Sequence, residues 1–322
     1  MRDTMGTDKV KQEIMRILAE KFRNRLDCIG LDFSNLQEIR MRVDAPFILV
    51  IGGEECFVSL DGNLTRDVRC ALTVTSGDLK ETLQYISGYS LYAFEDELRQ
   101  GFITVQGGHR VGVAGKIVTE NGKIKTMKYI SFLNIRLAHE ITGCANHILP
   151  YILEDGKVCH SLIVSPPRCG KTTLLRDIIR QLSNGNEKRR GMTVGVVDER
   201  SELGACHQGV PQNDLGIRTD ILDCCPKRNG MIMLVRSMAP EVIAVDEIGE
   251  KEDVEAIVYA MNCGCQMLAT AHGRDMDELR AKPVFREMIG ERLFKRYIVL
   301  DNLGGVGHVS KIFNERGMML YA

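Results

Sequence analysis

The stretch Ser-Pro-Pro-Arg-Cys-Gly-Lys-Thr-Thr at residues 165–173 decides the fold of this chain. It follows an apolar stretch, 161–164, and precedes a helical pattern over 172–182. A Gly-Lys-Thr sequence at the turn between a buried strand and a helix is typical of a phosphate-binding loop, because the free N–H groups at the helix start point at phosphate oxygens. The stretch therefore predicts a nucleotide site in an α/β domain.

The residues of this loop have separate expected roles. We expect Lys171 to reach the β- and γ-phosphates of ATP and the hydroxyl of Thr172 to bind Mg²⁺. Ser165 stands where the usual loop has its first glycine, and it fits if its φ is negative, since a left-handed residue would cost on the order of 1 kcal/mol. We interpret Cys169 as a small, inert filler, with a redox-sensitive thiol as the alternative. The candidate nucleotide-binding residues are Ser165, Pro166, Pro167, Arg168, Cys169, Gly170, Lys171, Thr172 and Thr173.

Two adjacent acids follow the apolar strand 242–245. Because ligands bind at the carboxyl ends of strands in a parallel sheet, we expect Asp246 to hold Mg²⁺ together with Thr172, and Glu247 to polarise the attacking water. Acids at this place can instead begin a helix, where the helix dipole favours them. A phosphate loop in the same domain favours the catalytic interpretation.

Two further strands end in polar residues. The apolar strand 266–270 is followed by His272, and if it lies between the two strands described above, Thr270 or His272 lies beside the γ-phosphate and reports its presence. A structural histidine is the alternative. Another buried strand ends in Asp198 and Glu199. The candidate catalytic residues are Glu247, Glu199 and His272.

Residues 1–138 have a different pattern from the rest of the chain. Apolar residues recur every four positions over 10–26, which predicts one amphipathic helix, and Ser76 is expected to cap a later helix. Asn121-Gly122 predicts a hairpin turn between two strands. We therefore predict a smaller α+β domain over 1–138, followed by an α/β phosphate-loop ATPase domain with a parallel sheet over 139–322.

The composition is that of an ordinary globular protein. Of the 322 residues, 44% are hydrophobic and 26% are charged, which excludes disordered and fibrous classes. The formal net charge is −1, so no long-range field gathers nucleic acid or an anionic membrane, although a local basic patch is compatible with this value. Eleven scattered cysteines and an N-terminus without a signal peptide lead us to expect a cytoplasmic protein with reduced thiols, whose membrane contact, if any, is peripheral.

Several stretches together resemble the core of the secretion and pilus-assembly ATPases, which belong to the P-loop NTPase superfamily. Asp198-Glu199 is similar to that family's aspartate box, and Thr270-Ala271-His272 is similar to its histidine box. The resemblance implies a RecA-like domain that hydrolyses ATP with Mg²⁺. It is carried by residues 236–248, 253–256 and 270–275.

A narrower resemblance, to the stage III sporulation AA family, covers both predicted domains. It rests on residues 107–112, 171–177, 198–202 and 236–238 in combination, and extends from 38–40 to 294–297. This resemblance implies an ATPase at the mother-cell side of a membrane in endospore-forming bacteria, acting with membrane proteins of the stage III sporulation complex in a secretion-like channel to the forespore.

The same resemblance implies a homo-oligomeric ring, commonly a hexamer, in which an arginine from one subunit completes the neighbour's site. Each candidate arginine could instead form a surface or interdomain ion pair. The candidates are Arg40, Arg110, Arg136, Arg218 and Arg236.

Two other classes of function stay open. A nucleic-acid motor on the same core would need basic residues and aromatic platforms, but the chain has no Trp, 6% aromatic residues and a net charge of −1, so no nucleic-acid partner is expected. A nucleotide-gated, non-enzymatic scaffold is slightly favoured by Ser165 and disfavoured by the Asp246-Glu247 pair.

Overall fold

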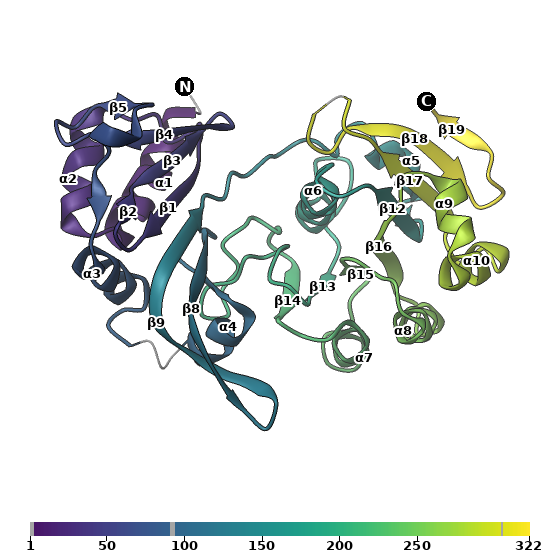
Figure 1. The fold of residues 1–322 in the computed structure, drawn as a ribbon. Helices are drawn as coiled ribbons and strands as arrows, with labels where there is room; N and C mark the ends of the chain where they lie inside the picture. Colours follow the sequence, from purple (N-terminus) through teal and green to yellow (C-terminus); the bar gives the residue numbers. More distant parts are fainter. Residues whose placement is uncertain (1–2, 91–93, 304) are drawn as a thin grey trace. The chain divides into compact units, whose positions relative to one another are not determined.

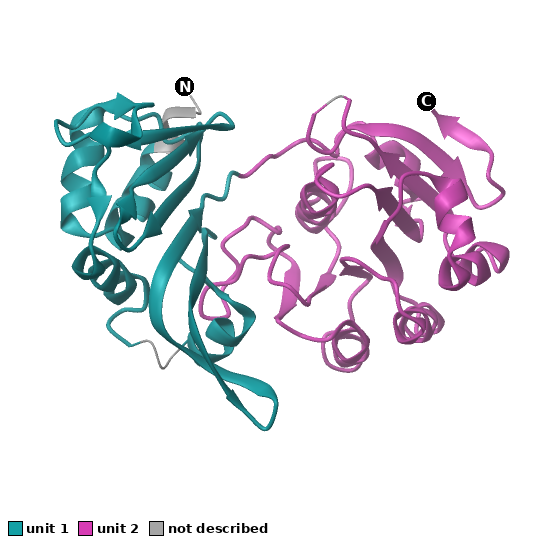
Figure 2. Ribbon diagram, viewed as in Figure 1, with its two compact units in different colours: residues 1–139 teal, residues 140–322 magenta. Residues whose placement is uncertain are grey.

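The computed structural model describes residues 3–90, 94–303 and 305–322. The chain forms two compact units, Met1–His139 and Glu140–Ala322 (Figure 2). The domain boundary expected after residue 138 lies one residue away, and independent folding of the two parts stays a prediction. None of the described helices has both the length and the apolar character that crossing a bilayer requires.

The first unit is built on a seven-stranded antiparallel sheet with the order β5-β4-β3-β1-β9-β8-β7 (Figure 1). One apolar core joins this sheet to the helices, and in it the rings of Phe22 and Phe47 stack with centroids 4.2 Å apart. The strands are β1 (Leu36–Arg42), β2 (Ala45–Pro46), β3 (Ile48–Ile51), β4 (Glu54–Val58), β5 (Leu64–Thr65), β6 (Thr73–Val74), β7 (Phe102–Thr104), β8 (Arg110–Glu120) and β9 (Lys123–Arg136). The α-helices are α1 (Asp3–Ile17), α2 (Glu20–Ile29), α3 (Ser76–Ile86) and α4 (Glu95–Gln100).

The single helix predicted over 10–26 is wrong, because the chain breaks between α1 and α2. Ala19 has an extended ψ of 147°, and its N–H donates to the hydroxyl of Thr82 in α3 at 3.0 Å. Both helices still bury apolar residues in the same core, so the four-residue repeat runs through the break. A side chain 63 positions away therefore ends a helix that the local pattern would continue.

Two turn predictions have different outcomes. Thr75, not Ser76, caps α3: its hydroxyl accepts from the Asp78 N–H at 3.2 Å, and the Asp78 carboxylate accepts from the Thr75 N–H at 2.8 Å. The hairpin between β8 and β9 is confirmed, with Asn121 and Gly122 at φ 50° and 76°. Positive φ at both positions is what a two-residue hairpin turn requires.

The second unit contains an eight-stranded sheet with the order β14-β13-β15-β16-β12-β17-β18-β19. The strands from β14 to β17 in this order are parallel, and β18 and β19 add antiparallel neighbours. Strands β12, β13 and β15 are buried along their whole length, as parallel strands covered on both faces are. The bounds are β12 (Ser161–Ser165), β13 (Val194–Asp198), β14 (Thr219–Asp223), β15 (Val242–Val245), β16 (Gln266–His272), β17 (Arg296–Leu300), β18 (Val309–Asn314) and β19 (Met319–Tyr321). Outside this sheet, β10 (Leu153–Glu154) pairs with β11 (Lys157–Val158).

Helices cover both faces of this sheet (Figure 1). On one face, Leu174 and Ile178 of α6 pack with Ile163 of β12, whereas the other face carries a separate core that includes residues of α7 to α10. This confirms the predicted fold class, an α/β domain with a parallel sheet preceded by an α+β part. The helices are α5 (Leu149–Ile152), α6 (Lys171–Asn184), α7 (Lys227–Ser237), α8 (Lys251–Asn262), α9 (Met276–Ala281) and α10 (Pro283–Gly290).

Strand β16 lies between β15 and β12, which is the arrangement that the interpretation of His272 requires. In register, Ser165 pairs with His272 and Val245 pairs with Ala269. The carboxyl ends of the three strands therefore meet at one edge of the sheet, where a doubly wound fold binds its ligands.

A histidine is fully buried at the end of the first unit. His109 Nδ1 accepts from the N–H of Ala138 at 3.0 Å, and its Nε2 lies 3.3 Å from Glu13 Oε2. Burial, followed by the charges of His139 and Lys9, lowers the pKa of His109 to about 4. The imidazole is therefore neutral at pH 7, and its contact with Glu13 is a hydrogen bond donated by Nε2.

Acid is expected to destabilise the chain through His109. In the unfolded chain a histidine binds a proton near pH 6.5, whereas the pKa of His109 in the fold is about 4. The stability that this difference contributes, about 3 kcal/mol, is present above pH 6.5 and is lost as the pH falls toward 4. Urea unfolding at pH 7, 6 and 5 measures the slope, which should be shallower in His109→Gln. The exposed His147→Gln is the control, and an equal change in both variants would contradict this account.

Candidate nucleotide site

The predicted phosphate loop begins at a buried serine. Ser165 is the last residue of β12, its backbone is extended, and its hydroxyl donates to the carbonyl of Pro166 at 2.6 Å. Positive φ values occur instead at Arg168 (66°) and Gly170 (85°). The replacement of the first glycine by Ser165 therefore costs no left-handed strain.

The end of the loop is closed by a segment from the far end of the chain. The N–H of Gly307, between β17 and β18, donates to the carbonyl of Cys169 at 2.8 Å. A Cβ atom at Gly170 would lie 2.3 Å from the Gly307 nitrogen, so only glycine fits there. Cys169 itself is 4% exposed, in agreement with its interpretation as a filler.

Four polar side chains gather where the loop enters α6. Lys171 is only 6% exposed, and its Nζ lies 3.0 Å from Glu247 Oε1 and 3.4 Å from His272 Nε2. His272 Nε2 lies 2.8 Å from the same Glu247 oxygen, and Arg200 Nη1 lies 2.5 Å from Glu247 Oε2. The carboxylate of Glu247 thus stands between three nitrogen groups from different segments.

Glu247 is held in its ionised form. Burial raises the pKa of its carboxyl, but the hydrogen bond and charge of Lys171, with the charges of His272 and Arg200, outweigh this and lower the pKa. Its backbone has a φ of 55°, and its N–H donates to the hydroxyl of Thr270 at 2.9 Å. Non-glycine residues rarely adopt this conformation, and such strain is concentrated at functional sites.

A second cluster of oxygen atoms lies beside the first. The hydroxyl of Thr172 donates to Asp246 Oδ2 at 2.8 Å, and the hydroxyl of Thr270 donates to Asp246 Oδ1. Carboxylate and hydroxyl oxygens are hard ligands of the kind that Mg²⁺ prefers. Thr172 and Asp246 therefore fit the metal role that the sequence predicts for them.

A buried acid and a half-buried arginine support this edge: Asp198, which belongs to the stretch similar to the aspartate box, and Arg176, for which no role was predicted. Asp198 accepts from the N–H groups of Glu202 and Gly204, both at 2.8 Å. Burial raises its pKa to about 6; those two bonds oppose the rise, and the nearby carboxylates, Asp246 among them, add to it. Arg176 donates to the carbonyls of Leu203 at 2.9 Å and Glu202 at 2.6 Å, and burial lowers its pKa. The segment after β13 is thereby fixed near Asp246.

The structure brings together six of the residues singled out from the sequence and directs one elsewhere. Glu199 forms an ion pair with Lys227 of α7, and no contact of its side chain with Lys171 or Glu247 is found among the described residues. Its catalytic role stays a prediction. The six that meet at the sheet edge are Lys171, Thr172, Asp246, Glu247, Thr270 and His272.

The arginine that reaches Glu247 within the chain is Arg200, which was not among the five candidates. Its position two residues after a buried strand was the signal that could have found it, because β13 neighbours β15 in the sheet. The candidates have other described surroundings: Arg40 pairs with Glu38, Arg110 stacks on Phe102, Arg136 lies 3.7 Å from Glu38, Arg218 donates to the Ser183 carbonyl, and Arg236 is exposed at the end of α7. Which arginine acts across subunits stays a prediction.

A parallel sheet with the predicted phosphate loop and two acids at its carboxyl edge, preceded by an α+β part, is the fold found in RecA-like secretion and pilus ATPases. Two solved structures share it over most of their length. The ATPase DotB of Legionella pneumophila has a TM-score of 0.54 and 14% identity, over 87% of this chain and 77% of DotB. The pilus retraction motor PilT with bound ADP has a TM-score of 0.55 and 14% identity, over 87% of this chain and 76% of PilT.

The sequence places the chain more narrowly. It belongs to the family described as sporulation stage III, protein AA, whose profile matches residues 8–320. The stage III sporulation protein AA of Bacillus subtilis (strain 168) is 39% identical over 309 residues, which cover 96% of each chain. The family resemblance stated from the sequence is therefore confirmed.

The contact between Gly170 and Gly307 can be tested with a matched pair of glycines. Gly264 has a similar φ of 93° and nothing within 4 Å of an added Cβ, so Gly264→Ala measures left-handed strain alone, about 1–2 kcal/mol. Gly170→Ala should cost clearly more in urea unfolding, because the Cβ also displaces backbone at Gly307. Equal losses in the two variants would show that the C-terminal segment does not press on the loop.

Proposed function

We propose that the chain is a Mg²⁺-dependent ATPase. Two neighbouring pairs of side chains carry the proposal: Lys171 lies 3.0 Å from Glu247, and Thr172 lies 2.8 Å from Asp246. Both pairs lie at the edge of the sheet where parallel strands bind their ligands. A lysine and an anion already meet there, as do two oxygen ligands suited to Mg²⁺. The likeness to ATPases of known structure supports the proposal.

Each side chain has a part in the proposed reaction. Phosphate oxygens replace Glu247 as the partner of Lys171, which frees one carboxylate oxygen of Glu247 to accept a hydrogen bond from the attacking water. Arg200 and His272 keep that carboxylate oriented, and its lowered pKa keeps it ionised at neutral pH. Thr172 and Asp246 would hold Mg²⁺, which would supply neutralisation of phosphate charge. His272 contacts both Lys171 and Glu247, so its hydrogen-bond partners would change when the γ-phosphate is lost.

We further propose that the ATPase works as a homo-oligomeric ring, and we expect this ring to be a hexamer. Together with membrane proteins of the stage III complex, the ring would energise a secretion-like channel between mother cell and forespore. Membership of the sporulation family and the likeness to secretion and pilus ATPases support this. An arginine supplied in trans would complete each site. The alternatives are a RecA-like nucleic-acid motor, which the composition disfavours, and a scaffold that binds ATP without hydrolysing it.

Phosphate release from Mg²⁺-ATP, measured over a range of protein concentrations, tests the proposal. We expect turnover to rise more than linearly with protein concentration, because each site needs a neighbour. Lys171→Ala should abolish nucleotide binding, since the P-loop ammonium is lost. Glu247→Gln should bind ATP and hydrolyse it about 100-fold or more slowly, because the group that polarises water is neutralised.

Matched controls for this experiment lie in α8 of the same unit. Lys251 and Glu252 are exposed, so Lys251→Ala and Glu252→Gln repeat the two chemical changes away from the loop. Chelation of Mg²⁺ by EDTA should stop turnover in every variant. ATP binding without turnover at any protein concentration would favour the scaffold, and wild-type turnover in Glu247→Gln would rule out its assigned role.

Arg200→Ala tests whether this arginine positions Glu247. Loss of a positive partner raises the pKa of Glu247, so the acid limb of the pH–rate profile should move to higher pH while ATP affinity changes little. Arg274→Ala is the control, because Arg274 is 81% exposed and pairs with Glu278 on α9. An unshifted acid limb with an unchanged kcat would show that Arg200 plays no part in the site.

A further inference from the structure

The distal half of the β8–β9 hairpin has no role in the proposed ATPase. This segment, residues 115–131 and here called the distal hairpin, extends beyond the part of β9 that pairs with β1. Helix α4 contacts its second strand close to the turn, where Arg99 Nε donates to the carbonyl of Lys125 at 2.9 Å. Arg99 also forms ion pairs with two acids of α4, Glu95 at 3.8 Å and Asp96 at 2.8 Å.

The distal hairpin is strongly basic on a chain that is nearly neutral as a whole. It carries four lysines and one glutamate, a net charge of +3, against −1 for the whole chain. Lys116 and Lys128 are directly opposite each other across the two strands, and no ion pair is recorded for either among the described residues. Like charges in this position destabilise a strand pair, so the arrangement lacks the anion that would neutralise it.

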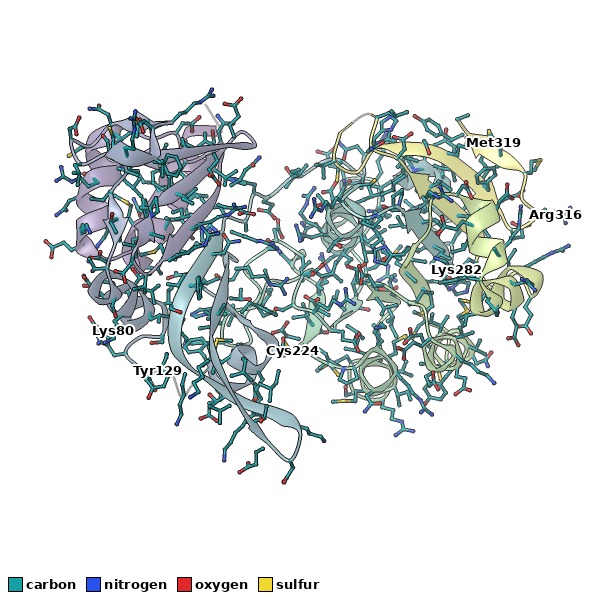
Figure 3. All side chains as sticks on the ribbon, in the orientation of Figure 1. Lys80, Tyr129, Cys224, Lys282, Arg316 and Met319 are labelled. Atoms are coloured by element: carbon teal, nitrogen blue, oxygen red, sulfur yellow. The ribbon has the colours of Figure 1, made fainter. Side chains whose placement is uncertain are left out.

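A bulge next to Lys128 leaves the ring of Tyr129 exposed to solvent. The register slips between Ala114 and Lys116, leaving Tyr129 in the bulge with a φ of 49° and a side chain that is 80% exposed (Figure 3). The bulge closes over Gly115, where an added Cβ would lie 2.8 Å from the Tyr129 carbonyl oxygen. Bulges commonly redirect a side chain. Here Tyr129 itself adopts the left-handed conformation, and its aromatic ring is exposed.

Two aliphatic side chains are exposed on the same hairpin. Ile117 is 42% and Ile124 is 46% exposed, and their cross-strand partners, Met127 and Thr119, place both on one face of the ladder. Successive residues of a strand point to opposite faces, so Lys116 and Lys128 lie on the other face of the ladder, and the distal hairpin has one basic face and one face with exposed isoleucines. Lysine ammonium groups bind lipid phosphates, aliphatic side chains enter the acyl boundary, and tyrosine favours the depth between them.

We propose that the distal hairpin docks the protein on the anionic surface of a lipid bilayer. The basic face complements acidic headgroups. A hairpin that enters the headgroup region by its turn also places the isoleucines of the opposite face in contact with lipid, which is a reason to prefer a bilayer over a purely polar anion. Single-stranded nucleic acid would call for a succession of stacking rings, whereas the distal hairpin offers only Tyr129. The proposal is independent of the ATPase activity, because it uses no residue of the nucleotide site.

The absence of tryptophan from the chain gives a direct test. Tyr129→Trp in the full chain creates a sole tryptophan, whose emission should shift to the blue and be quenched by brominated acyl chains when vesicles of phosphatidylglycerol and phosphatidylcholine are added. Pure phosphatidylcholine vesicles should give little change, and 0.5 M salt should weaken the response. Tyr259→Trp on α8 is the matched control, and its emission should not respond.

Charge and contact are then separated by two further variants in vesicle flotation. The double variant Lys116→Gln, Lys128→Gln should lower the partition coefficient about 30-fold, because each lysine near an anionic surface contributes about 1 kcal/mol to binding. Lys157→Gln with Lys251→Gln makes the same charge change at exposed positions of the second unit and should leave binding unchanged. The hairpin variant should melt no lower than wild type, since a like-charge pair is removed. Tyr129→Ser keeps the charge and should weaken binding while leaving salt sensitivity intact.

Three results would overturn the proposal. One is an emission spectrum of the Tyr129→Trp variant that does not shift with anionic vesicles, and another is an equal loss of binding in the hairpin and control lysine variants. The third is a larger response to a single-stranded oligonucleotide or to polyglutamate than to vesicles of equal charge concentration, which would assign the distal hairpin to nucleic acid or to an acidic protein instead. Phosphate release measured on the same variants keeps this outcome separate from that of the ATPase proposal.

Discussion

The second unit depends on one constraint: the charge of Lys171 must be met inside the protein. An ammonium group that is 6% exposed loses most of its hydration, and without an anion beside it the buried charge would destabilise the fold. Glu247 supplies the anion from the end of β15, and His272 approaches from the end of β16. The parallel register of β15, β16 and β12 is what makes these atoms neighbours. In the proposed function, phosphate binding at this edge exchanges one anion for another.

Much of this site was predictable because its parts are local and the rule that joins them is general. Each of the segments ending at Ser165, Val245 and Thr270 reads as a short apolar strand followed by polar residues. In a parallel sheet such ends lie at one edge, so the sequence pattern becomes a statement about space. Lys171, Thr172, Asp246, Glu247 and His272 were found in this way.

What the sequence could not reveal depends on partners far along the chain. Arg200 looked like one more exposed arginine, and only the adjacency of β13 and β15 lets its guanidinium reach Glu247. Thr82 breaks the first helical pattern by accepting one N–H, although nothing in residues 10–26 indicates a break. The closure of the loop by Gly307 is of the same kind. Periodicity describes what a segment favours by itself, and it carries no information on which distant side chain competes for its backbone.

The place of β12 in the sheet also bears on the order in which the chain can fold as it is made. Both neighbours of β12, which are β16 and β17, emerge from the ribosome about a hundred or more residues after it. The strand that precedes the predicted phosphate loop is thus a central, fully buried strand of the finished sheet that has neither partner while about a hundred further residues are made, a state in which exposed edges favour aggregation. The sheet of the first unit closes within residues 36–136, before β12 is made. Chaperone dependence in this chain is therefore expected to concentrate on the second half, even though that half contains the more regular fold.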